Sequence, residues 1–141
     1  MRYIQFIGIT IVLFLNACSG SANQGQTATT TTPEPVASGE SIYKKTCIAC
    51  HQATGEGIAG AFPPLAKSDY LADHEYAIKQ VLKGSSGELV VNGKTYNNVM
   101  PPQALTDEEI AAVLTYVYCN FGNKACTITP AEVKTIRATL L

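Results

Sequence analysis

Two cysteines and a histidine fall within five residues, at Cys47, Cys50 and His51, in a chain of 141 residues that has only five cysteines and two histidines. The spacing C-x-x-C-H is typical of the attachment of a c-type haem. The two thiols would add to the two vinyl groups of the haem, and the imidazole would lie beneath the iron as a ligand. The segment therefore predicts one covalently bound haem c, with iron as its metal.

Three other interpretations of this segment explain less of it. A redox-active C-x-x-C pair is typical of a βαβ setting, which the sequence does not predict. A zinc site needs four ligands, and the other cysteine pair of the folded region, Cys119 and Cys126, is far downstream. A disulfide between Cys47 and Cys50 would leave His51 without a role. Haem attachment accounts for all three side chains.

The second axial ligand is predicted to be Met100. Haem iron in cytochromes c is bound by His and Met, and the thioether raises the reduction potential. Met100 is the one methionine besides Met1, which the processing proposed below would remove. It lies in a loop that Pro101 and Pro102 restrict, whereas methionines of a core usually lie on helices or strands. The alternative ligand, His74, lies at the polar start of a predicted helix, as a surface residue would.

The N-terminus is predicted to be an export signal. Residues 1–2 are Met and Arg, and residues 3–15 form an apolar run that is too short to span a bilayer comfortably. The next residues, Leu-Asn-Ala-Cys, resemble the lipobox of bacterial lipoproteins, in which cleavage precedes a lipidated cysteine. We expect a signal peptide at 1–17, lipidation at Cys18 and a lipid-anchored protein on the periplasmic side of a bacterial membrane. The alternative is an ordinary signal peptide with an incidental cysteine.

Composition separates a tether from a folded domain. Residues 18–37 are rich in Thr, Ser, Gly, Gln and Pro and cannot bury enough apolar surface to fold, so a flexible lipidated tether is expected there. Residues 38–141 are expected to form a single domain. The formal net charge is −1, and no run of basic residues suggests a nucleic-acid partner.

Helix signals dominate the folded domain. Capping residues predict helix starts at Ser38, Asp73, Thr106 and Thr129, and Gly84 is expected to end the second of these helices. A short helical turn is expected at 68–71, and Asn92-Gly93 predicts a small hairpin. Three or four helices, one hairpin and long loops, without βαβ alternation, indicate an all-α class.

Residues 38–141 resemble the class I monohaem cytochromes c, and are similar to the cytochrome c domain appended to some copper-containing nitrite reductases. The matching segments are "IYKKTCIACHQATGEGIAGAFPPLAKSDYL", "VNGKTYNNVMPPQ", "LTDEEIAAVLTYV" and "FGN". The resemblance implies a cytochrome c fold of three to five helices around one haem, with the first and last helices crossing over one haem edge. It also implies that the carbonyl of Pro63 accepts a hydrogen bond from Nδ1 of His51, and that Leu65, with Tyr96 or Asn97, lines the haem pocket.

One segment departs from that pattern. Cys119 and Cys126 flank "NFGNKA", and two exported thiols at this spacing predict a structural disulfide. Closing so short a loop would stabilise the fold by about 2–2.5 kcal/mol. Two unpaired cysteines are the alternative.

Two filled axial positions leave no open site for a substrate, so we expect an electron carrier rather than an enzyme. Its partners would be a redox donor and a redox acceptor, with a nitrite reductase or a terminal oxidase as candidates. The uncharged segments "AGAF" and "VMPPQ" predict a small apolar docking patch. Two alternatives stay open: a haem-bearing subunit of a larger oxidoreductase complex, and a five-coordinate haem peroxidase or gas sensor if Met100 is not a stable ligand.

Overall fold

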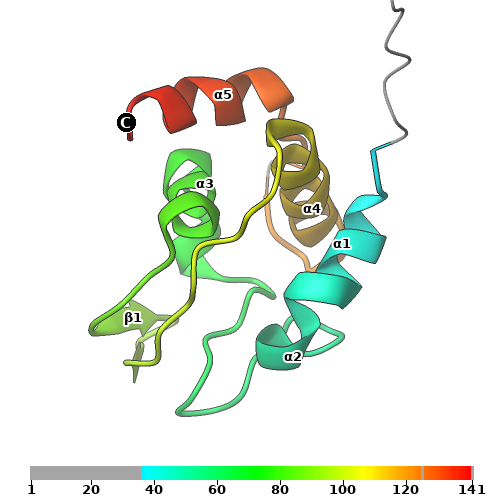
Figure 1. Cartoon of the computed structure of the whole chain (residues 1–141). Coiled ribbons are helices and arrows are strands. Elements are labelled where there is room, and N and C mark those ends of the chain that lie inside the picture. The colour runs from blue at the N-terminus through cyan, green and yellow to red at the C-terminus, as the bar shows by residue number, and fades with distance from the viewer. Residues whose placement is uncertain (1–35, 125, 141) are drawn as a thin grey trace, which may run out of the picture. The chain divides into compact units, whose positions relative to one another are not determined.

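The computed structural model describes residues 36–124 and 126–140, and it contains five α-helices and a two-stranded antiparallel sheet. Figure 1 shows their arrangement. The helices are α1 (Gly39–Thr46), α2 (Ile48–His51), α3 (His74–Lys83), α4 (Asp107–Asn120) and α5 (Pro130–Ala138), with a 3₁₀ turn at Asp69–Leu71 and strands β1 (Leu89–Val91) and β2 (Lys94–Tyr96). The mostly helical class with one hairpin is confirmed. The predicted signal peptide, the lipidation site Cys18 and nearly all of the tether lie outside the described residues.

Side-chain caps start the longer helices where the sequence predicts them. The caps are Ser38 for α1, Asp73 for α3, Thr106 for α4 and Thr129 for α5, and each side chain accepts a hydrogen bond from a backbone N–H of the first turn. The last two form complete capping boxes, in which a glutamate also bonds the N-cap backbone. These local bonds fix where the helices begin before any tertiary packing is considered.

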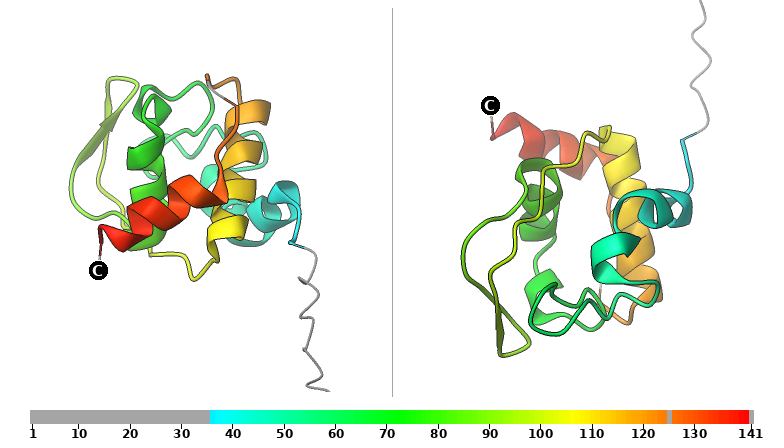
Figure 2. Two further views of the ribbon diagram at one scale, coloured as in Figure 1. Left: turned by 90° about the horizontal axis from the view of Figure 1, so that it is seen from above. Right: turned by 60° about the horizontal axis from the view of Figure 1, so that its bottom comes forward.

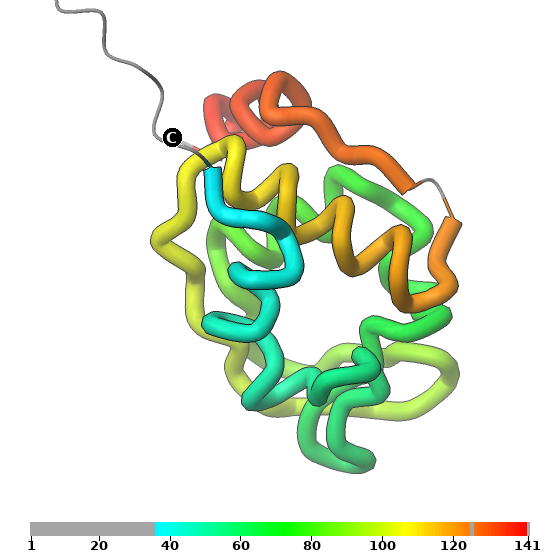
Figure 3. Tube along the Cα trace, turned by 90° about the vertical axis from the view of Figure 1, so that its right-hand side faces the viewer, coloured from blue at the N-terminus to red at the C-terminus, as the bar shows by residue number. Residues whose placement is uncertain are grey.

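Helix α1 packs against α4, as the Cα trace in Figure 3 shows. Gly39 makes the close approach possible, because a Cβ at this position would lie 2.1 Å from the carbonyl oxygen of Ala112. Tyr43 of α1 is buried against the rings of Tyr116 and Phe121. The resemblance implied that the last helix crosses the first, and this is wrong: the partner of α1 is α4, and one further helix follows it.

That further helix, α5, lies across α3 and α4 (Figure 2). Arg137 holds it there, donating to Asp107 at 2.7 Å and to the carbonyl of Leu105 at 2.9 Å. A disulfide joins Cys119, on α4, to Cys126, and their Cα atoms are 4.7 Å apart. The disulfide closes the connection between α4 and α5 and lies outside the region where the predicted haem residues gather.

The hairpin packs its inner side chains against the rest of the domain. Val91 and Tyr96 are buried, whereas Val90 is 55% exposed. The turn is anchored by Asn92, which exchanges hydrogen bonds with Asp69: each backbone N–H donates to the other side chain, at 2.8 and 2.9 Å. Across residues 36–124 and 126–140, the structure shows no helix with both the length and the apolar character that crossing a membrane requires.

Candidate haem site

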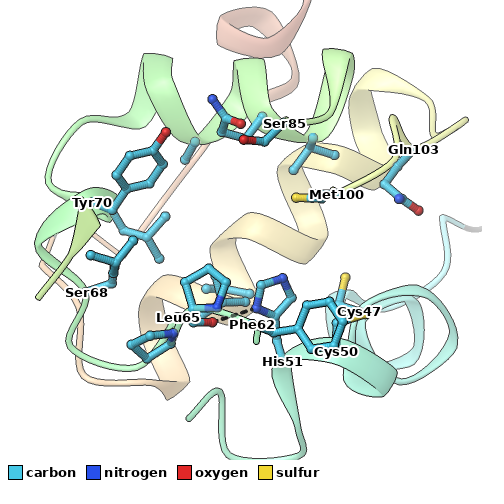
Figure 4. A pocket seen from close by; sticks show the side chains of 18 of the residues that line it. Cys47, Cys50, His51, Phe62, Leu65, Ser68, Tyr70, Ser85, Met100 and Gln103 are labelled. Atoms are coloured by element: carbon cyan, nitrogen blue, oxygen red, sulfur yellow. Dashed lines mark hydrogen bonds between the residues drawn. The ribbon is translucent and has the colours of Figure 1, made fainter. Parts of the chain in front are cut away.

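A large cavity lies between the α2 turn, α3, the hairpin, the loop that carries Met100 and one face of α4. The space between its walls is about 1300 Å³, and part of that space is open to solvent. The side chains of Cys47, Cys50, His51 and Met100 all line it (Figure 4). Among the described residues that line the cavity there is no Asp, Glu, Lys or Arg.

One turn of helix brings the two thiols and the imidazole together. The carbonyl of Cys47 accepts hydrogen bonds from the backbone N–H groups of Cys50, at 3.2 Å, and His51, at 3.0 Å. Residues three and four apart on a helix share a face, so this turn aims all three side chains at the same wall. Gln52 ends the turn with φ 63°, and its carbonyl accepts a 2.6 Å hydrogen bond from the hydroxyl of Tyr43.

The two thiols are free and half-buried. Burial raises the pKa of Cys47, although a hydrogen bond with the hydroxyl of Thr46 acts in the opposite direction. A redox-active dithiol needs a lowered thiol pKa, so the environment of Cys47 does not favour that chemistry. Cys119 and Cys126 are bonded to each other, and therefore they cannot complete a zinc site.

The imidazole of His51 is oriented by a backbone carbonyl. His51 is 8% exposed, and its Nδ1 lies 3.0 Å from the carbonyl oxygen of Pro63. Burial lowers the pKa of His51, while the bond to Pro63 raises it by less. A neutral ring that donates from Nδ1 leaves Nε2 as an acceptor, which is the form of histidine that binds a metal. Figure 4 shows the ring pointing into the cavity.

Glycine allows the loop after α2 to bring Pro63 back to His51. Gly57 has φ 67°, and its N–H donates to the carbonyl of His51 at 3.0 Å. A Cβ at Gly57 would lie 2.3 Å from the carbonyl oxygen of Phe62 and 2.6 Å from that of Pro63. The loop therefore folds so tightly that the position of the Pro63 carbonyl depends on the absence of a side chain at residue 57.

Met100 lines the opposite side of the cavity. In Figure 4 its sulfur and the imidazole of His51 enter the cavity from opposite sides. The backbone of Met100 pairs with Ser85 in an isolated antiparallel bridge, and Gln103 donates from its backbone to Val81 of α3 at 2.9 Å. The rival ligand His74 does not line the cavity; its ring contacts Tyr118 instead.

The structure also places the other residues that were predicted to line the haem pocket. Leu65 and Tyr96 line the cavity, whereas Asn97 does not. Its neighbour Asn98 does, and its side-chain amide donates to the carbonyl of Ala61 at 3.1 Å, which joins the two loops on either side of the cavity. Sequence reasoning missed Asn98, and no local signal marks it, because its partner is 37 residues away.

The donor set of the cavity fits a haem. Two unbonded thiols lie on one helical turn beside an imidazole, a thioether faces that imidazole, and the remaining lining is mostly apolar. Cys47 and Cys50 would hold a haem through thioether bonds, and His51 and Met100 would bind its iron. An apolar and uncharged lining also matches the flat hydrocarbon surface of the macrocycle.

Comparisons with known proteins agree with this geometry. Residues 36–118 match the cytochrome c family. The chain is 43% identical over 113 residues to cytochrome c-552 of Thermus thermophilus, an alignment that spans 72% of this chain and 86% of the relative. It is 31% identical to cytochrome c-551 of Bacillus subtilis, over 79% and 88% of the two chains. The family match ends within α4, so α5 lies beyond it.

A second group of similar proteins consists of larger subunits. The chain is 29% identical over 133 residues to the fructose dehydrogenase cytochrome subunit of Gluconobacter japonicus, an alignment that covers 87% of this chain but 25% of that subunit. The cytochrome c subunit of the quinone-type alcohol dehydrogenase of Gluconacetobacter polyoxogenes is also 29% identical, with 22% of its length covered.

Proposed function

The chain belongs to the cytochrome c family, and on that premise we propose that it shuttles single electrons between respiratory partners through one haem with His51 and Met100 as axial ligands. As a cytochrome c it carries a covalently attached haem c, and it is an electron carrier rather than an enzyme. When bound, the haem supplies an iron that changes reversibly by one electron.

The observation that carries the proposal is the arrangement of ligands around the cavity. His51 and Met100 enter from opposite sides, and Cys47 and Cys50 lie on the same turn as His51. With His51 and Met100 both binding the iron, a substrate would have no open coordination position, so electrons would enter and leave at the edge of the ring. The uncharged lining would disfavour the extra positive charge of the ferric state, and together with the thioether it would raise the reduction potential.

Absorption spectra of the purified protein test the ligation. We expect a sulfur-to-iron charge-transfer band in the oxidised protein, no binding of carbon monoxide by the reduced protein at neutral pH, and pigment that acidified acetone does not extract. Met100→Leu should abolish the band and allow carbon monoxide to bind. His74→Gln is the matched control, because His74 is the other histidine and lies outside the cavity. Carbon monoxide binding by the wild-type protein would favour a five-coordinate sensor or peroxidase instead.

The rim of the cavity suggests how partners dock. Residues 57–66 and 97–105 contain no charged side chain, and Asn98 links the two segments. Ile58 is 41% exposed and Val99 67% exposed. We therefore expect a small apolar contact with a redox partner outside the cytoplasm, such as a nitrite reductase or a terminal oxidase. Such a contact permits rapid exchange of partners.

Partner turnover distinguishes apolar docking from electrostatic steering. Val99→Asp should reduce the rate of electron transfer to the partner, whereas joint substitution of Lys79 and Lys83 by glutamine should change it little. A large, salt-sensitive loss in the double lysine variant would show that charge steering dominates.

We further propose, from the N-terminal sequence, that the mature protein is anchored through a lipid on Cys18 and extends from the membrane on the tether at 18–37. Mass spectrometry of the membrane fraction tests this: the N-terminal peptide should begin at a diacylated Cys18. A soluble product cleaved at another position would exclude the anchor.

A second candidate function is that of a haem-bearing component of a dehydrogenase complex. The similarity to fructose and alcohol dehydrogenase cytochrome subunits supports it. Purification from detergent-solubilised membranes separates the two: stable co-elution with a dehydrogenase would support the subunit role, and recovery of the chain alone would support the mobile carrier.

A further inference from the structure

The loop that carries Met100 is fastened to the end of α3 through its backbone. The N–H of Ser85 donates to the carbonyl of Met100, and the N–H of Met100 donates to the carbonyl of Ser85, both at 2.9 Å. These two bonds form an isolated antiparallel bridge outside the named strands. The ligand residue is thus held at its own peptide groups, independently of any bond that its sulfur forms.

Gly84 packs closely against the Met100 side of this bridge. It ends α3 with φ 74°, and a Cβ built on it would lie 2.4 Å from the carbonyl oxygen of Met100 and 2.8 Å from the nitrogen of Pro102. Real Cβ atoms essentially never approach another atom within 3.0 Å, and these atoms belong to backbone that two prolines restrict. A side chain at residue 84 would therefore push the Met100 segment away from α3.

This backbone contact bears on the proposed bond between the Met100 sulfur and the haem iron. A thioether sulfur carries no charge and would bind the iron weakly, so a loop that already holds the sulfur in position would favour the bond. The sequence alone does not predict this contact between Gly84 and the Met100 segment, because the positive φ at a helix end is enough to explain a glycine there.

We propose that Gly84 is a positioning residue for the Met100 ligand: its lack of a Cβ lets α3 and the methionine loop meet backbone to backbone, and this contact keeps the sulfur in place. The inference rests on the proposed His51 and Met100 ligation. According to this proposal, the end of α3 influences the reduction potential through the Met100 loop, although Gly84 has no side chain that could contact the haem.

The test compares Gly84→Ala with Gly87→Ala in the holoprotein. Gly87 has φ 89°, so alanine is conformationally strained there too, but a Cβ at residue 87 would meet nothing within 4 Å. Both variants therefore carry strain from a positive φ, and only the first also crowds the Met100 segment.

Gly84→Ala should weaken or abolish the charge-transfer band, allow the reduced protein to bind carbon monoxide, and lower the reduction potential. We expect at least a tenfold larger fraction of protein with Met100 detached than in wild type. Gly87→Ala should keep the wild-type band and potential. A Gly84→Ala protein with the wild-type spectrum and potential, or two variants that change equally, would overturn the proposal.

Hydrogen exchange in the wild-type protein keeps the proposal testable if Gly84→Ala does not accumulate. The amides of Ser85 and Met100 should become exposed together, at the same guanidinium concentration at which the charge-transfer band disappears. Fast exchange of both amides while the band is intact would contradict the proposal. If the wild-type protein shows no band at all, the proposed ligation fails instead, so the two failures are distinguishable.

Discussion

Gly57→Ala is the substitution through which the structure makes its sharpest prediction about His51. Because a Cβ at residue 57 would lie 2.6 Å from the Pro63 carbonyl oxygen, that carbonyl must move. Its present position places the oxygen 3.0 Å from Nδ1 of His51. The variant should therefore lengthen or break the hydrogen bond that orients the ring, although it changes neither partner of the bond.

The size of the effect follows from the value of one hydrogen bond. Such a bond contributes about 0.5–1.5 kcal/mol, and 59 mV corresponds to a tenfold change, or about 1.4 kcal/mol, for a one-electron couple. If the whole contribution differed between the two oxidation states, the potential would shift by at most about 65 mV. The direction is upward, since a hydrogen-bonded imidazole is the stronger electron donor and stabilises ferric iron. We expect a rise of about 20–60 mV.

A spectroelectrochemical titration measures this shift, with Gly60→Ala as the control. Gly60 lies in the same loop with φ 75°, but a Cβ there would meet nothing within 4 Å. Gly60→Ala should therefore leave the potential within error of wild type. A lowered potential in Gly57→Ala, or equal shifts in both variants, would refute the link between the Pro63 carbonyl and the iron.

The remaining predictions concern stability. Asn123→Ala removes a side chain that donates to two backbone carbonyls and accepts from one backbone N–H, so guanidinium unfolding should show a loss of about 2–3 kcal/mol. Joint replacement of Cys119 and Cys126 by serine should cost about 2–2.5 kcal/mol and leave the potential unchanged, because neither residue lines the cavity. Hydrogen bonds from Thr129, first from its N–H and then from its hydroxyl, lower the pKa of Glu132. The stabilisation that Glu132 provides should thus be complete above its unfolded-state pKa of about 4.3. It should disappear as the pH falls through the lower folded-state pKa. The free energies of unfolding in urea of wild type and Glu132→Ala should therefore converge in acid.

Local signals predicted the helices well because their determinants are local. Each predicted cap, at Ser38, Asp73, Thr106 and Thr129, bonds a backbone N–H within three residues of itself. The hairpin at Asn92-Gly93 likewise depends on two residues that accept positive φ. In the site, the C-x-x-C-H spacing is itself one helical turn, so the sequence contains its geometry directly.

The parts that sequence reasoning missed depend on contacts between distant segments. Asn123 bonds Leu65 across 58 residues, and Asn98 bonds Ala61 across 37. The close approach of α1 to α4 requires that Gly39 has no side chain, and the nearby carbonyl of Ala112 is known only once both helices are placed. No periodicity or spacing in the sequence indicates which distant backbone segment packs closely against a glycine.

Both residues that we propose as axial ligands, His51 and Met100, are positioned by a close backbone contact at a glycine, and this makes the proposed ligation testable. On the His51 side, the carbonyl of Pro63 lies where a Cβ on Gly57 would clash with it. On the Met100 side, the backbone of Met100 lies where a Cβ on Gly84 would clash with it. If His51 and Met100 bind the iron as proposed, crowding at Gly57 should weaken electron donation by the imidazole and raise the reduction potential, whereas crowding at Gly84 should weaken the thioether bond and lower the potential. The double variant should therefore lie between the two single variants if both act at the iron. If both substitutions merely loosened the fold around the haem, their shifts would have the same sign, since opening the cavity to water favours the charged ferric state in each case.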